Sequence, residues 1–141
     1  MMLLKKILLP LLPLLLLSCY SVNAEVVVVV HPTNNSSFDQ SEISKLFLGK
    51  AKSFSDGNQA VPLNQEEAST ARQEFDANVL SKSGSQLKAY WSKLIFTGKG
   101  SPPKEVTNDA EVIDLVGKNP SMIGYINAAS LTDSVKSVGK F

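Results

Sequence analysis

The sequence has few of the residues from which catalytic and metal sites are usually built. Its 141 residues include one cysteine, Cys19, and one histidine, His31. A metal ion needs several ligands at suitable spacing, and His31 has no such companions near it in the sequence. Nucleophilic catalysis needs a nucleophile beside a base, and the chain contains neither a serine elbow motif nor a glycine-rich phosphate loop. We therefore expect a protein that is not an enzyme and that needs no cofactor.

Long runs of one charge are also missing. The 14 basic and 13 acidic side chains are interspersed along the chain. No basic run suits a nucleic acid or a membrane surface, so neither is expected as a partner. The longest apolar run, over residues 7–17, is shorter than the roughly 20 residues of a membrane-spanning helix. We expect no membrane span in the mature chain.

The first 24 residues have the pattern of a secretory signal peptide. A short basic start precedes the apolar run, and residues 21–24 are small residues of the kind that precede a cleavage site. We expect cleavage after Ala24, export to the periplasm and a mature domain of residues 25–141. The alternative is a lipoprotein in which Cys19 becomes the lipidated first residue. Cleavage after Ala24 removes the only cysteine, and a disulfide is then excluded.

Strand and helix patterns alternate along the mature chain. Glu25 is followed by an unbroken β-branched run up to Val30, which is typical of a strand buried on both faces. Asp39 and Glu42 have the spacing of a capping box, which predicts a helix ending near Gly49. We expect three further helices: one that ends at about Leu80, one that begins at Ser85 with Trp91 and Ile95 on its apolar face, and one that follows Asn108. We also expect strands over residues 122–126 and 135–138. This alternation predicts one α/β domain around a small sheet.

Residues 61–75 are the segment around which the rest of the chain is organised, and in it an apolar segment leads into a predicted helix. The first turn of a helix offers unpaired N–H groups and the positive end of the helix dipole. Ser69, Thr70 and Arg72 lie near that turn. An anion is therefore the first ligand to consider at this place.

Several short motifs occur in an order that is characteristic of one family. They are residues 43–49 with their closing glycine, the Phe-Ser-Asp-Gly turn at 54–57, the segment 69–75, Phe-Thr-Gly at 96–98 and Ile-Gly-Tyr-Ile at 123–126. In this order the mature chain resembles the phosphate-binding-protein-like family of ABC transporter substrate-binding proteins, which have the type II periplasmic binding fold. The resemblance implies a single-lobe three-layer α/β/α domain with a small mixed sheet, and phosphate or a similar oxyanion as ligand.

The resemblance also implies which residues would bind the anion. The family has an arginine followed four residues later by Ser-Gly-Thr at a helix start. Ser69 falls on that serine, Thr70 and Ala71 fall on the glycine and threonine, and Gln65 falls on the arginine. The implied anion-binding residues are Ser69, Thr70, Ala71 and Arg72. Because the mature chain is about one lobe long, the resemblance also suggests a homodimer or a periplasmic or transporter partner.

Two functional hypotheses depend on where the helix after residue 61 begins. If it begins at Ser69, N–H groups are free for an oxyanion. If it begins at Asn64, that residue and Glu67 form a capping box, and Ser69 lies inside the helix. The second start favours a stand-alone lobe that acts as an interaction or assembly module without a solute.

Overall fold

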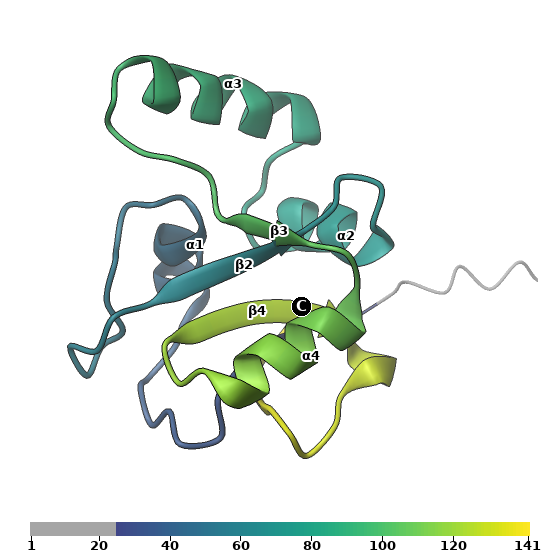
Figure 1. Cartoon of the computed structure of the whole chain (residues 1–141). Coiled ribbons are helices and arrows are strands. Elements are labelled where there is room, and N and C mark those ends of the chain that lie inside the picture. Colours follow the sequence, from purple (N-terminus) through teal and green to yellow (C-terminus); the bar gives the residue numbers. More distant parts are fainter. Residues whose placement is uncertain (1–24) are drawn as a thin grey trace, which may run out of the picture.

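A computed structural model describes residues 25–141 (Figure 1). The predicted signal peptide and the alternative lipidation at Cys19 lie outside the described residues. None of the described helices has both the length and the apolar composition needed to cross a bilayer.

One mixed five-stranded sheet forms the centre of the domain. In sequence order its strands are β1 (Val26–Val30), β2 (Val61–Gln65), β3 (Lys104–Val106), β4 (Met122–Asn127) and β5 (Lys136–Lys140). In space their order is β3-β2-β4-β1-β5. β2 runs parallel to β3 and β4, whereas β1 is antiparallel to β4 and β5. The predicted small mixed sheet is confirmed.

Helices cover both faces of the sheet and make the domain three-layered (Figure 1). The helices are α1 (Gln40–Phe47), α2 (Thr70–Asn78), α3 (Gly84–Phe96) and α4 (Asp109–Lys118), with the short 3-10 helix η1 (Ala128–Ser130) after β4. One core cluster joins the sheet to α1, α2 and the inner side of α3. A second cluster joins the opposite face to α4. This arrangement confirms the α/β/α fold class.

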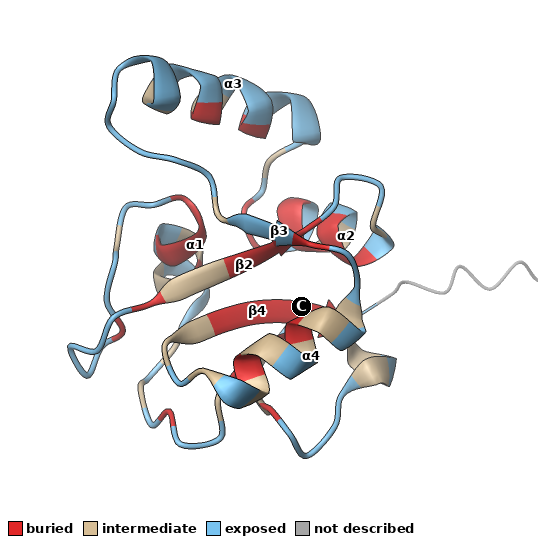
Figure 2. Ribbon diagram, in the orientation of Figure 1, coloured by how far each residue is buried: buried red, intermediate tan, exposed pale blue. Residues whose placement is uncertain are grey.

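β1 is buried on both faces, as its unbroken valine run predicts. Figure 2 shows in red the buried middle of β4, the strand beside it. Val26, Val28 and Val30 point into the cluster with α1 and α2, and Val27 and Val29 point into the cluster with α4. Successive strand residues face opposite sides, so only a strand between two helical layers can bury five valines in a row.

Local capping residues define several helix ends. The capping box at Asp39 is confirmed, because its carboxylate accepts from the Glu42 N–H at 2.7 Å and Glu42 accepts from the Asp39 N–H at 2.9 Å. The predicted end at Gly49 is also confirmed, since this residue has φ 70° and closes α1 in the left-handed region. Asn108 caps α4, although Glu111 accepts from the Thr107 N–H and not from Asn108.

Three details differ from the sequence-based expectations. α3 begins at Gly84 with Ser83 as its cap, one residue before the predicted start. Ile95 does not join the core, since 56% of its surface is exposed, and the neighbouring Phe96 is 93% exposed. The edge strand β3 was not predicted from the sequence, because Lys104 and Glu105 are exposed and only Val106 faces the core.

Candidate functional site

The candidate site lies where the parallel strands end and two helices begin. Gln65 at the end of β2 pairs with Val106 at the end of β3, and β4 ends beside them at Asn127. α2 begins after its cap Ser69, and α4 begins after its cap Asn108. In open α/β sheets, ligands bind outside the carboxyl ends of parallel strands. Helix N-termini at that edge add N–H donors and a positive dipole end.

The helix after β2 has Ser69 as its cap and Thr70 as its first residue, which agrees with the predicted start at Ser69. β2 continues to Gln65, so Asn64 is a buried strand residue and cannot cap a helix; the start at Asn64 is wrong. Ser69 has extended backbone angles, and its hydroxyl oxygen accepts the Arg72 N–H at 3.3 Å. The same hydroxyl donates to Gln65 Oε1 at 2.7 Å. Glu67 stays in the exposed loop before the helix.

Two backbone donors remain open at the start of α2. The N–H groups of Thr70 and Ala71 have no acceptor within residues 25–141. Thr70 is exposed, whereas Ala71 is buried. Because the Arg72 N–H is already bonded to Ser69, the free donors of this first turn are those of Thr70 and Ala71.

The Arg72 side chain is buried and surrounded by protein acceptors. Its Nε donates to Asp76 Oδ2 at 3.3 Å, and its Nη1 donates to the Gln65 carbonyl at 2.8 Å and to Glu105 Oε1 at 2.9 Å. Burial acts to lower the pKa of Arg72, but the hydrogen bond to Glu105 and the Asp76 charge outweigh it and raise that pKa. The guanidinium therefore stays charged and is neutralised inside the protein. It ties α2 to β2 and β3.

Gln65, which the resemblance aligns with a clamp arginine, is fully hydrogen-bonded within the chain. Its Nε2 donates to Asp109 Oδ1 at 2.8 Å and to the Tyr125 carbonyl at 2.9 Å, and its Oε1 accepts from Ser69. Its N–H donates to the Tyr125 hydroxyl at 3.0 Å. An amide can donate and accept at once, so Gln65 can link the Ser69 hydroxyl to the Asp109 carboxylate.

Asp109 holds the far side of the site together. One oxygen accepts from Gln65, and the other accepts from the Asn127 N–H at 3.1 Å, Asn127 Nδ2 at 3.0 Å and the Ser130 hydroxyl at 2.7 Å. In the sequence, Asp109 has only the pattern of a charge at a helix N-terminus, and nothing singles out Asn127 or Ser130. Their only signal is position, since they follow the Ile-Gly-Tyr-Ile strand where it leaves the sheet.

Tyr125 anchors the site to the core below it. Its hydroxyl donates to Asn64 Oδ1 and accepts from Gln65, and its ring stacks on Phe75 at 4.0 Å between centroids. Burial raises the pKa of Tyr125, which keeps the hydroxyl protonated and able to donate.

His31 lies away from this site, in the loop after β1. Its Nδ1 lies 2.8 Å from the Thr33 hydroxyl. Across the described part of the chain, no three His, Cys, Asp or Glu residues are grouped so as to hold a metal ion. The groups that the candidate site offers to a ligand are backbone N–H groups and hydroxyls, with carboxylates as close neighbours.

Comparisons with known proteins place the fold. No family model and no curated protein matches the sequence. Among solved structures, an ABC-type phosphate transport receptor from Vibrio cholerae matches over 82% of this chain with a TM-score of 0.64 and 16% identity. A Clostridium perfringens protein solved with bound phosphate has a TM-score of 0.63 and 20% identity, and PstS from Borrelia burgdorferi has 0.60 and 14%, again over 82% of this chain.

The match covers only part of those proteins. The aligned region is 46%, 45% and 47% of their respective lengths, so this chain spans just under half of each. At such identities the likeness concerns the fold. Residues 25–141 thus have the type II periplasmic binding fold of these phosphate-transport and phosphate-bound proteins, in a form of about half their length.

Proposed function

We propose that this protein is an exported solute-binding protein that binds phosphate or a similar oxyanion at the N-terminus of α2. The observation that carries the proposal is the pair of open N–H groups of Thr70 and Ala71 at the carboxyl edge of the parallel strands. The fold shared with phosphate-transport proteins supports this choice of ligand. The proposal includes export through a signal peptide over residues 1–24 that is then cleaved. It includes no catalytic activity.

The proposed donors are Ser69, Thr70 and Ala71, with Arg72 behind them. An oxyanion would accept from the two open N–H groups and from the Ser69 hydroxyl, which would turn from Gln65. Arg72 would act from below through its charge and by holding α2 against β3, since its Nε and Nη1 donors face Gln65, Asp76 and Glu105. Hydrogen bonds to charged acceptors contribute about 1.5–3 kcal/mol each.

Acidic neighbours set a limit on the affinity. Glu66 and Glu67 are exposed in the loop before α2, and Asp109 lies beyond Gln65. Their repulsion offsets part of the hydrogen bonding, so we expect a Kd of about 1 mM, which corresponds to about 4 kcal/mol of binding free energy.

Thermal unfolding with the variant Thr70→Pro tests the site. At a phosphate concentration of about ten times Kd, binding adds about 1.4 kcal/mol to the free energy of unfolding, or about 5 °C in Tm for a domain of this size. Proline is well tolerated at the first helical position, where it removes the Thr70 N–H together with the Thr70 hydroxyl and breaks no helical hydrogen bond. Ser69 already has φ −65° and ψ 129°, which a following proline allows. We expect this variant to fold and to lose most of the phosphate-induced shift.

Gln40→Pro provides the control, because Gln40 is also the first residue of a helix and lies outside the site. This substitution also removes the hydrogen bonds from Gln40 Nε2 to the Asn78 and Val79 carbonyls, which lowers the Tm without phosphate. It should keep the full phosphate-induced shift. If phosphate, sulfate and arsenate all leave the Tm of the mature protein unchanged at equal ionic strength, the binding proposal is wrong.

A second candidate function is an interaction module without a solute. It is favoured by the neutralised Arg72 and by the apolar end of α3, where Phe96 is 93% and Ile95 56% exposed. A module of this kind would associate through α3 with a second copy of the chain. The mass of the mature protein in solution separates this candidate from a monomeric binding protein.

A further inference from the structure

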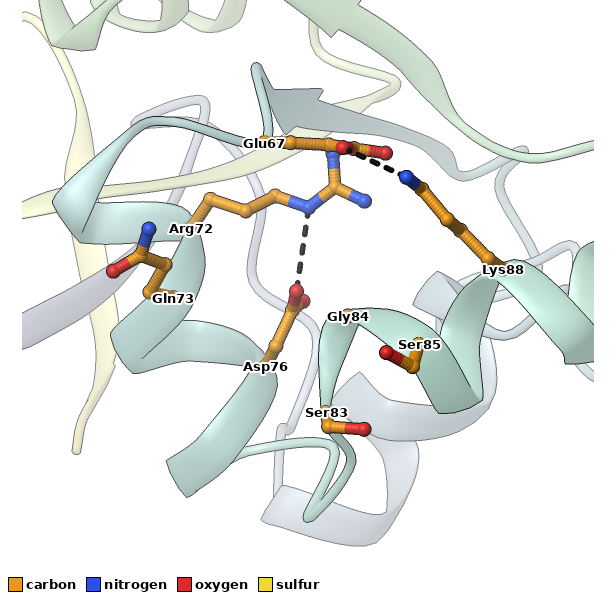
Figure 3. A pocket seen from close by; sticks show the side chains of 8 residues that line it. All are labelled: Glu67, Arg72, Gln73, Asp76, Ser83, Gly84, Ser85 and Lys88. Carbon is orange, nitrogen blue, oxygen red and sulfur yellow. Dashed lines mark hydrogen bonds and ion pairs between the residues drawn. The ribbon is translucent and has the colours of Figure 1, made fainter.

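A separate polar cavity lies between α2 and the first turn of α3 (Figure 3). Its volume is about 480 Å³, which is in the range of small-molecule sites. The buried side is formed by Arg72 and Asp76 of α2, which point toward one another. The exposed side is formed by Glu67 and Lys88, whose charged groups are 3.3 Å apart.

Asp76 has an acceptor without a partner beside this cavity. Its Oδ2 accepts from Arg72 Nε, but Oδ1 has no hydrogen-bond partner among the described residues although it is buried. The side chain is 8% exposed. Most buried polar atoms in proteins are hydrogen-bonded, so an orphaned carboxylate oxygen points to a missing donor. The final torsion of an aspartate is broad, and a small rotation would turn Oδ1 toward the cavity.

Donors without acceptors line the same cavity. Arg72 uses Nε and Nη1 within the protein, whereas its Nη2 has no acceptor in the part of the chain that the structure describes. The N–H groups of Gly84 and Ser85, in the first turn of the 13-residue helix α3, likewise have none there. These groups suit a carboxylate, because guanidinium and helix N-terminal donors bind planar anionic oxygens well.

The charges around the cavity are balanced. Arg72 and Lys88 are positive, and Asp76 and Glu67 are negative. A lone anion would meet two carboxylates, and a lone cation would meet a guanidinium and an ammonium group. A small molecule that carries both charges at opposite ends avoids both conflicts.

We propose that this cavity binds a small zwitterionic solute of the amino-acid type. Its carboxylate would accept from Arg72 Nη2 and the N–H groups of Gly84 and Ser85, and its ammonium group would donate to Asp76 Oδ1. An ammonium group has three donors and can serve the orphaned oxygen directly. This site goes beyond the oxyanion site at the start of α2; the two have Arg72 in common but use different backbone donors.

Ligand-detected and amide-detected NMR on the mature protein can test the proposal with the twenty L-amino acids, each added singly. We expect at least one of them to shift the amide signals of Gly84 and Ser85 in a saturable way. Its analogue without the ammonium group, its analogue without the carboxylate, and glycine betaine, which has no N–H donor, should not produce those shifts.

Two variants connect the binding to the cavity. Asp76→Asn keeps an acceptor for Arg72 Nε but removes the charge, and should weaken binding at least tenfold. Lys88→Met, at an exposed position, should fold normally and weaken binding by a few-fold. Asp114→Asn is the matched control, because Asp114 is an exposed carboxylate on α4 and pairs only with Lys118 in the described residues. It should leave binding unchanged.

The outcomes separate this proposal from the oxyanion site. Thr70→Pro should not alter amino-acid binding, so a loss of phosphate binding alone would contradict only the proposed function. If no amino acid shifts the signals, or if Asp76→Asn binds as tightly as the parent protein, the zwitterion site is wrong. If phosphate itself saturates the Gly84 and Ser85 signals and binds more tightly to Asp76→Asn, the cavity is an anion site, which also overturns the proposal.

Discussion

At the scale of single residues, the site depends on what Gln65 can do and an arginine cannot. A guanidinium only donates hydrogen bonds, whereas the amide of Gln65 donates to Asp109 and accepts from Ser69. The Ser69 hydroxyl is therefore occupied within the chain, and the positive charge expected at this position is absent. The backbone N–H groups of Thr70 and Ala71 are then the main hydrogen-bond donors available to an anion.

Glu66 should weaken anion binding at these donors. Its exposed side chain precedes the N-terminus of α2 and competes there as a negative charge. We expect Glu66→Gln to tighten phosphate binding about two- to five-fold, since a charge near a helix terminus contributes about 0.3–1 kcal/mol. Isothermal titration at low ionic strength measures the change. Glu74→Gln, in the second turn of α2, is the control, and an equal gain in both variants would contradict a local effect.

At the scale of elements, α4 packs closely against β4 at Gly124. A Cβ atom added at Gly124 would lie 2.6 Å from Val112 Cγ1, and Val112 is itself fully buried. The glycine of the Ile-Gly-Tyr-Ile motif is therefore required for this helix to lie directly on the strand. That contact in turn places Asp109, at the start of α4, against Gln65 and Asn127.

Gly124→Ala should lower the free energy of unfolding by about 1–3 kcal/mol, the usual cost of overpacking a core. Urea unfolding followed by circular dichroism measures this cost. A double-mutant cycle with Val112→Ala gives the internal control, because removal of the Val112 methyl groups makes room for the new Cβ. If Gly124→Ala costs as much in the Val112→Ala background as in the parent protein, the steric explanation is wrong.

At the scale of the whole molecule, the chain covers just under half of the solved proteins that share its fold. The proposed oxyanion site is open to solvent at Thr70, which is exposed. A second surface would raise affinity by removing water from the ligand and strengthening its hydrogen bonds. The apolar end of α3 is the most exposed apolar surface among the described residues and offers a place for a second copy.

We expect the mature protein to self-associate at high concentration if the interaction-module candidate is right. Light scattering after size exclusion should give the mass of a dimer, and Phe96→Ser should return the monomer, because Phe96 is 93% exposed and contributes little to the folded core. Phe96→Leu, which keeps the position apolar, is the control. A monomer at all concentrations would contradict this candidate and leave the monomeric binding protein.

The sequence alone determined the features that depend on near neighbours. The valine run of β1, the capping box at Asp39 and the left-handed glycine at Gly49 each depend on residues within a few positions of one another. Their physics is local, so hydrophobic periodicity and capping chemistry were sufficient to predict them. The order of short motifs was sufficient to predict the fold class.

Only the tertiary structure decided which residues of the site are hydrogen-bonded to one another. Gln65 meets Asp109 across 44 positions, and Tyr125 meets Asn64 across 61. Arg72 meets Glu105 on the edge strand β3, which the sequence pattern did not reveal. These partners come together through strand pairing and helix packing, and no local pattern encodes them. That is why the sequence pointed to the start of α2 as an anion site, while the structure decided which of its donors remain free.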